Sequence, residues 1–431
     1  MLDRYSPALW LSTRPTHGLL WLLALVSLPL YAISFRLAPD WLPTRFYPVL
    51  YAPMFALFLA ATVLVFRRPG AAVPPILAIG VLVRLLTTVD PPSLSSDCYR
   101  YAWDGRVQRE GTSPYAWPPE AVALAPLRDA AIYPNINRKS DRTVYPPGAQ
   151  VLFRALPFDV DGLRYAMIAC DLATMALLAR LLAACGLDPA RVVVYAWCPL
   201  VVYEVGNNGH VEAAMLPFLV GSALVARVGK SGVVGLLVGA AASIKLYPIL
   251  ALVAVERTAR ARTTLASLAV VGVLYAAYGF GAGDRVLGFL PKYFTSAEDH
   301  NIGLRRLIEW GLPAAVPHPR EVAFAACVAL MAAGLVAVRA KGGSPEQMLL
   351  RVAGVYLLTL PSAFHPWYAL WLVPWLCFSP SAAGLWLLAT LPLSYLKYGA
   401  PGGVMPGWVV PVELVPTVAL LALEARWKLH E

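Results

Sequence analysis

The chain has 431 residues, of which 59% are hydrophobic and only 14% are charged, and its formal net charge is +10. Soluble domains carry about 25% charged residues, so an ordinary soluble protein is excluded. The basic residues are scattered over short loops and form no continuous stripe, which argues against a nucleic acid as partner. The positive charge is better explained by the excess of Lys and Arg in the cytoplasmic loops of membrane proteins.

Long apolar blocks begin near the N-terminus and recur along the chain. Residues 19–35, 46–66 and 322–338 are each long enough, or nearly so, to cross a hydrocarbon core of about 30 Å as a helix. Arg4 and Arg14 precede the first block. That block is long, and no small-residue cleavage site follows it, so we interpret it as a retained anchor. We predict a single all-α, polytopic membrane domain of about 12 to 14 spans.

Short loops with Lys and Arg predict which side of the membrane each span ends on, because such loops face the cytoplasm. Short basic loops of this kind follow several apolar blocks. They contain Arg67 and Arg68, Arg227 and Lys230, residues 257–262, Arg339 and Lys341, and Arg426 and Lys428. The long loop 90–162, a second loop 281–320, and the short stretches 206–210 and 365–368 are then on the outer side. Both termini are expected inside.

The first outer loop opens with residues 95–106, which combine two carboxylates, two arginines and three large aromatic side chains. Ser95 or Ser96 can cap a short helix that Gly111 would end. On that helix Asp97 and Asp104 would share one face with Tyr101, because their spacing is i, i+4, i+7.

Two interpretations of that helix remain open. The carboxylates serve a reaction, with Asp97 or Asp104 as a general base. Alternatively, the helix lies in the membrane interface, and its acids only pair with Arg100 and Arg106.

The apolar segment 233–255 lies between two basic loops but is too short for two full spans. We predict two short helices that meet near Lys245, with Pro248 as the break. Broken helices are tolerated where freed backbone groups line a polar cavity, and they often mark binding sites. A cation at membrane depth is costly and usually functional; the alternative for Lys245 is that it extends to the interface.

The remaining unusual polar residues fall on the same outer side. His210 and Glu212 precede an apolar block, where they either serve a site or cap a helix. Adjacent Arg305 and Arg306 suit a phosphate, or bind anionic headgroups non-specifically. An aromatic belt explains the residues after His365, but it does not explain the histidine itself.

Together these motifs resemble the GT-C glycosyltransferases, integral-membrane enzymes that use polyprenyl-phosphate sugars. The chain is most similar to the bacterial family 87 type, which includes mannosyltransferases. The resemblance rests on six motifs spread over most of the chain: Asp97-x-Tyr-Arg-Tyr-x-Trp-Asp-Gly, Gly111-x-x-Pro-Tyr, Tyr145-Pro-Pro-Gly, Asn208-Gly-His-x-Glu, Lys245-x-Tyr-Pro and His365-Pro-Trp-Tyr.

The resemblance implies a GT-C-like bundle in the bacterial cytoplasmic membrane, with its site facing the periplasm or cell exterior. It implies transfer of a hexose, mannose above all, from a polyprenyl-phosphate sugar to a hydroxyl of a lipid-linked, glycan or protein acceptor. The reaction would be inverting and need no metal or other cofactor. Its partners would be the sugar donor, membrane lipids and the glycan or lipid acceptor.

Such chemistry needs a base for the acceptor hydroxyl, and cations where charge develops on the departing phosphate. The sugar passes through an oxocarbenium-like state, as in glycosidases. The base is expected to be Asp97, with Asp104 as the alternative. The predicted donor phosphate site consists of Lys245, Arg305, Arg306 and His365, and the predicted substrate contacts are Tyr101, Trp103, Tyr145, His210 and Glu212. The competing hypothesis is a flippase or transporter of a lipid-linked sugar, for which we find no internal inverted repeat.

Overall fold

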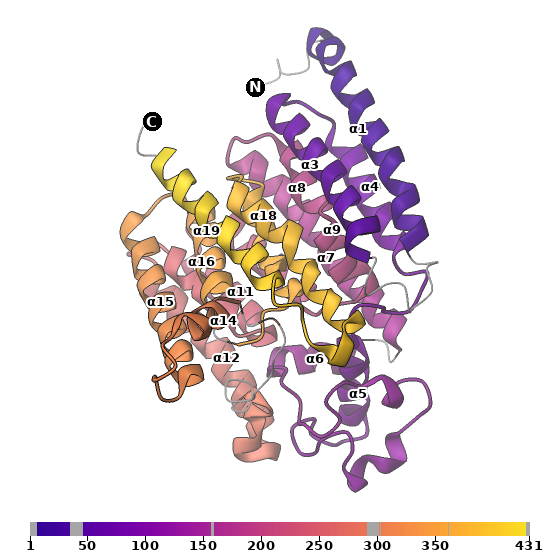
Figure 1. The fold of residues 1–431 in the computed structure, drawn as a ribbon, viewed down its shortest axis with the longest axis vertical. Coiled ribbons are helices and arrows are strands. Elements are labelled where there is room, and N and C mark those ends of the chain that lie inside the picture. The colour runs from indigo at the N-terminus through magenta and orange to yellow at the C-terminus, as the bar shows by residue number, and fades with distance from the viewer. Residues whose placement is uncertain are drawn as a thin grey trace.

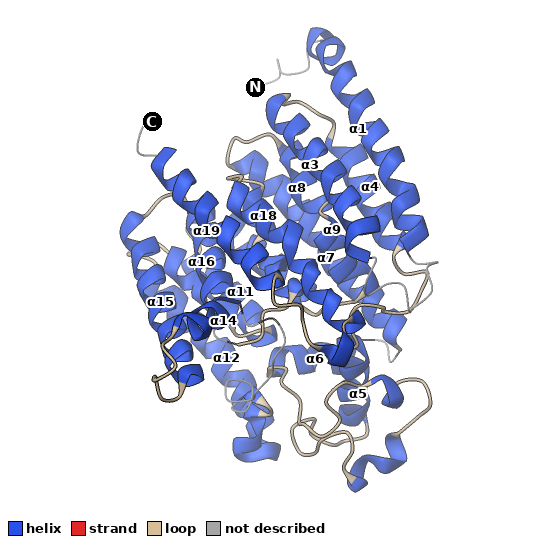
Figure 2. Ribbon diagram, viewed as in Figure 1, coloured by secondary structure: helices blue, strands red, loops and turns tan. Residues whose placement is uncertain are grey.

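The computed structural model describes residues 7–34, 46–156, 159–290, 301, 303–360 and 362–427. Those residues form helices joined by loops, and no strand occurs among them (Figure 2). This confirms the predicted all-α fold class. By length and composition four of the helices can cross a membrane: Val49–Arg67, Val160–Ala184, Arg260–Leu287 and Pro319–Lys341. Shorter apolar helices accompany them, as in a helical membrane protein, and the expected 12 to 14 spans remain a prediction.

Three long helices precede the acidic stretch: α1 (Pro7–Ser34), α3 (Ala52–Arg67) and α4 (Val73–Leu86). A π-helical segment, η1 (Phe46–Tyr51), leads into α3. Both α3 and α4 carry proline in their first turn, where the missing N–H would have no helical partner anyway.

The predicted helix after Ser96 is present as α5 (Asp97–Arg109). Gly111 follows it with φ +78°, a left-handed conformation that favours glycine. The loop then forms two 3-10 turns, η2 (Val122–Leu127) and η3 (Tyr133–Asn135), before α6 (Pro147–Ala155). Gly105 lets α5 lie directly on α6, because a Cβ there would lie 2.2 Å from the carbonyl oxygen of Phe153.

The middle of the chain alternates long helices with broken ones. Between α7 (Val160–Ala184) and α10 (Glu212–Ala226) there is no regular span. Four short pieces follow one another instead, and the last three are buried throughout: η4 (Pro189–Val192), α8 (Val193–Ala196), α9 (Pro199–Val201) and the π-helical η5 (Val202–Asn207). Pro199 interrupts this run, because it lacks the N–H that a continuous helix requires.

The predicted break near Lys245 is confirmed. Helix α11 (Ser231–Ile244) ends there, and Lys245 is extended at φ −139° and ψ 139°. The second piece, η6 (Tyr247–Ala254), is a 3-10 helix rather than the expected α-helix. Pro248 stands in its first turn and cannot donate to the preceding turn.

The last third begins with α12 (Arg260–Ala282) and the 3-10 turn η7 (Gly283–Leu287). After residues that lie outside the described ranges come α14 (Gly303–Gly311), α15 (Pro319–Lys341) and α16 (Pro345–Thr359). The chain closes with short pieces and one long helix: η8 (Pro366–Trp371), α17 (Val373–Leu376), α18 (Ala382–Thr390), η9 (Leu391–Gly399), η10 (Pro401–Gly403) and α19 (Val409–Trp427).

Both termini lie at one end of the bundle, and α5, α6 and the loop between them lie at the other (Figure 1). Helix α12 extends toward the end that holds α5 and α6 (Figure 1). The Tyr278 hydroxyl near its C-terminus donates to Gln108 of α5 over 2.8 Å, and the backbone N–H of Phe289 donates to Thr143 over 3.0 Å. The basic stretch 257–262 precedes α12 and therefore lies at the opposite end of that helix from Tyr278. The side of the membrane that it faces remains a prediction.

Candidate active site

Asp97 occupies the first turn of α5, where the helix dipole favours a negative charge. The side-chain amide of Asn137 donates to its Oδ1 over 2.6 Å. Its Oδ2 lies 3.8 Å from Nδ1 of His210, and 15% of its side chain remains exposed. The carboxylate is therefore held on one side and accessible on the other.

Two tyrosines pack against this carboxylate. Burial raises the pKa of the Tyr145 phenol well above its usual value, and the charge of Asp97, which accepts a side-chain hydrogen bond from it, raises it further. Burial also raises the pKa of Tyr101, whose ring meets Tyr145 edge-on at 4.9 Å and stacks on Phe153 at 4.6 Å. Both phenols thus remain protonated and can donate at neutral pH.

Lys245 lies over the ring of Tyr145. Its Nζ is 5.0 Å from the centre of that ring and 5.6 Å from the centre of the Tyr368 ring, at cation–π distance from both. The same Nζ forms an ion pair of 2.8 Å with Glu212, a fully buried carboxylate at the start of α10. The break after α11 therefore places a cation beside the ring that hydrogen-bonds Asp97.

The two predicted histidines are joined through one tryptophan. Trp367 is stacked against His210 at 4.0 Å on one face and His365 at 4.2 Å on the other, with ring planes within 18° and 7°. His365 also meets Tyr368 edge-on at 5.6 Å. The motif at residues 365–368 is therefore more than an aromatic belt, because it carries one histidine and packs on another.

The structure thus brings together seven of the predicted site residues, which come from α5, the following loop, α10, the break after α11, and the start of η8. They are Asp97, Tyr101, Tyr145, His210, Glu212, Lys245 and His365. We refer to these seven residues as the outer cluster.

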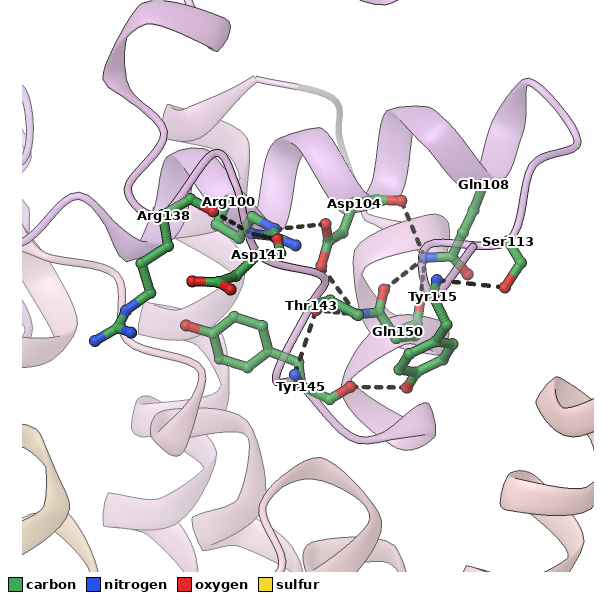
Figure 3. A network of polar contacts seen from close by, with 10 residues as sticks. All are labelled: Arg100, Asp104, Gln108, Ser113, Tyr115, Arg138, Asp141, Thr143, Tyr145 and Gln150. Carbon is green, nitrogen blue, oxygen red and sulfur yellow. Dashed lines mark hydrogen bonds and ion pairs between the residues drawn. The ribbon is translucent and has the colours of Figure 1, made fainter. Parts of the chain in front are cut away.

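Asp104 lies in a different network, which Figure 3 shows. One of its carboxylate oxygens accepts from Arg100 over 2.8 Å and the other accepts from Gln150 over 3.0 Å. Gln150 also donates to Thr143 over 2.9 Å. Asp104 is only 2% exposed. Both of its carboxylate oxygens are occupied by groups that hold α5, α6 and the loop together.

Three further candidates lie on other elements or faces. Trp103 is buried and packs against Tyr133 at 5.5 Å. Arg305 and Arg306 are on α14, which packs on α15 and α19, and approach Glu309 at 3.3 and 3.5 Å. Burial lowers the pKa of Arg305. The phosphate role of the two arginines remains a prediction.

Sequence reasoning missed two buried charges. Arg84 of α4 forms an ion pair with Asp171 of α7, both without solvent exposure, in the middle of the bundle. Glu204 of η5 is 1% exposed and lies 3.3 Å from His210. The available signal was a carboxylate inside the apolar run 201–205, since an ionisable residue at membrane depth is a site candidate by default.

The outer cluster has the parts that a group transfer from a lipid phosphate needs. A partly exposed carboxylate can take a proton from a hydroxyl. A lysine close by can stabilise a developing negative charge. Tyr145 contacts both groups, and Tyr368 lies beside the lysine.

Comparison with known proteins adds one match. Residues 55–261 match the family model described as alpha-(1->6)-mannopyranosyltransferase, N-terminal domain. This confirms the resemblance to membrane mannosyltransferases. The matched segment includes six of the seven residues of the outer cluster, all but His365. No curated protein and no solved structure matches the chain.

Proposed function

Because residues 55–261 match the alpha-(1->6)-mannopyranosyltransferase family model, we propose that this protein is a membrane mannosyltransferase whose donor is a polyprenyl-phosphate mannose. The acceptor is a hydroxyl of a lipid-linked, glycan or protein substrate on the outer side of the membrane. The observation that carries the proposal is the outer cluster itself, in which Tyr145 contacts a base candidate through its hydroxyl and a cation through its ring.

In the proposed reaction Asp97 removes the proton of the acceptor hydroxyl, whose oxygen attacks the anomeric carbon. The bond between that carbon and the phosphate oxygen breaks, and the phosphate leaves with the electron pair. Attack on the face opposite the leaving group inverts the anomeric configuration. Asp97 suits this role because its carboxylate lies at a helix N-terminus, where the dipole favours negative charge, and keeps part of its surface open.

Lys245 is the proposed contact for the departing phosphate, with His365 on its far side next to Tyr368. Glu212 would hold the amine in this position through their ion pair of 2.8 Å. Tyr145 would hold Asp97 in place through its hydroxyl and Lys245 through its ring. Polyprenyl phosphate, an amphipathic molecule, would present its headgroup where α11 is interrupted.

The test is to incubate the purified protein with polyprenyl-phosphate mannose and a mannose oligosaccharide, and to measure polyprenyl phosphate and lengthened product. Parallel reactions contain polyprenyl-phosphate glucose or a nucleotide-linked mannose. Product from polyprenyl-phosphate mannose alone supports the proposal. Product only from the nucleotide sugar overturns the donor assignment. Movement of the intact donor across vesicles without release of polyprenyl phosphate would favour the transporter hypothesis.

A further inference from the structure

Glu204 is a buried carboxylate directly behind the outer cluster. Its Oε1 accepts from the Tyr395 hydroxyl over 2.7 Å, and its Oε2 accepts from the Asn208 side chain over 2.9 Å. The same Oε2 lies 3.3 Å from Nε2 of His210. It is carried by η5, a π-helical turn, and such turns are frequent at functional sites.

His210 therefore lies between two carboxylates, with Asp97 at 3.8 Å from Nδ1 and Glu204 at 3.3 Å from Nε2. Its side chain has no solvent exposure, and neither ring nitrogen makes a hydrogen bond within the described structure. A neutral imidazole has one N–H and one lone pair, so it can donate to only one of the two acids. The three groups can therefore be satisfied together only when they share an additional proton.

We propose that Glu204 and His210 are positioning residues that orient Asp97 and share the proton it removes. The inference rests on the proposed function. The acceptor O–H breaks, its oxygen bonds to the sugar carbon, and the proton goes to the Asp97 carboxylate. That proton then passes to Nδ1 of His210, while the N–H on Nε2 is stabilised by Glu204. The leaving phosphate takes the electron pair of the bond that breaks, so charge and atoms balance.

Other titratable and charged groups contact or influence Asp97, Glu204, Trp367 or the residues on either side of His210. They are Tyr101 and Tyr145, Arg164 of α7, Glu212, Lys245, His365, and Tyr395 and Tyr398 of η9. A variant that changes Glu204 alone leaves all of these in place. A change in the pH dependence of turnover would then report on the interaction of Glu204 with His210 and Asp97.

The experiment compares Glu204→Gln with the wild-type protein over a pH series with polyprenyl-phosphate mannose. The amide keeps the size of the side chain and its acceptor oxygen for Tyr395. We expect kcat to fall roughly 10–100-fold with KM nearly unchanged, as when a group that orients a functional residue is lost. Loss of the negative charge of Glu204 makes protonation of His210 and Asp97 harder. The acidic limb of the kcat profile should therefore move to lower pH.

A second variant, Tyr395→Phe, keeps the test decisive if Glu204→Gln does not fold. It removes a hydroxyl that donates to Glu204. Without this donor, protonation of Glu204 and of the His210 beside it becomes easier, so the acidic limb should move to higher pH. The matched control is Glu346→Gln, another buried carboxylate, which pairs with Arg227 just beyond the C-terminal end of α10. It should leave both kcat and the pH profile unchanged.

The inference would be overturned if Tyr395→Phe had the kcat of the wild-type protein and an unshifted acidic limb. The same result would be required of Glu204→Gln where that variant folds. A shift of the limb in either variant in its expected direction would support it. An inactive wild-type protein would instead count against the proposed function, so the two failures are distinguishable.

Discussion

Asp97 and Asp104 stand seven residues apart on α5, yet their carboxylates have different surroundings. Asp97 accepts from Asn137 and Tyr145 and keeps 15% of its side chain exposed, whereas the nearly buried Asp104 has both oxygens occupied by Arg100 and Gln150. A base must be reachable by its substrate, while a residue that holds elements together must not be. The contrast predicts opposite effects for the same substitution.

For Asp97→Asn we expect kcat to fall by about 10²–10⁴-fold with unchanged thermal stability, because the amide cannot take a proton. For Asp104→Asn we expect the reverse, with a midpoint of unfolding lowered by the equivalent of about 1–3 kcal/mol, because Arg100 loses its buried charged partner. Steady-state kinetics measure kcat, and thermal unfolding in detergent measures the midpoint of unfolding, for both variants. Normal turnover in Asp97→Asn together with a stable but inactive Asp104→Asn would exchange the assignments.

Lys245 is predicted to contact the departing phosphate, and Arg306 provides a comparison of equal charge on α14. Lys245→Met should lower kcat by about 10²–10³-fold, as expected when a group that stabilises developing charge is removed. Arg306→Gln should change KM more than kcat if it only attracts the anionic headgroup. Kinetics at saturating acceptor separate these effects. Near-native kcat in Lys245→Met would place the phosphate elsewhere.

Tyr145 supplies a test based on pH. Burial and the Asp97 charge raise the pKa of its phenol, so it is a neutral donor over the whole working range. Tyr145→Phe removes a hydrogen bond that stabilises the charged form of the Asp97 carboxylate. The acidic limb of the kcat profile should move upward. Tyr115→Phe is the control, because that hydroxyl donates to the backbone oxygen of Tyr145 over 2.7 Å. An equal shift in both variants would contradict a specific bond to Asp97.

At the scale of elements, the cluster depends on the contact between α6 and the end of α11. Gly148 makes this contact: a Cβ there would lie 2.2 Å from the hydroxyl of Ser243 and 2.7 Å from its backbone carbon. Ser243 precedes Lys245 by two residues, and Tyr145 precedes Gly148 by three. Separation of the two elements would therefore move the cation away from the aromatic ring.

Gly148→Ala should accordingly lower both stability and kcat, since overpacking in a close contact costs about 1–3 kcal/mol. Gly272→Ala in α12 is the matched control, because a Cβ there has no heavy atom within 4 Å. It should be neutral, or stabilising by up to roughly 1 kcal/mol, from the better helix propensity of alanine. Thermal unfolding and kinetics of both variants decide. A harmless Gly148→Ala would show that α6 can shift without disturbing the cluster.

At the scale of the whole molecule, the arrangement of the bundle supports a testable orientation. Both termini lie at one end and the loop after α5 at the other (Figure 1). With the native cysteines replaced, Lys139→Cys should react with an impermeant thiol reagent added from outside, and Arg260→Cys should react only after permeabilisation. Labelling of position 260 but not 139 from outside would reverse the orientation, and with it the proposed side of the reaction.

The sequence by itself determined the helical fold class, the helix over the acidic stretch and the break at Lys245. These features depend on local signals: apolar blocks, a serine before the helix, a glycine after it and a proline in the second piece. The family resemblance also followed from motifs visible in the sequence. Such signals act over one to a few helical turns, so they can be recognised in the sequence without knowledge of the packing.

Only the tertiary structure decided which polar residues meet. Their spacing predicted that Asp97 and Asp104 share one face of the helix. In the packed structure Asp104 accepts hydrogen bonds from Arg100 and Gln150, whereas Asp97 lies near His210. Glu204 was overlooked because its partners are as distant as Tyr395, 191 residues later in the chain. Burial of a charge is settled by the groups that surround it in space, and those groups come from elements whose arrangement no local pattern encodes.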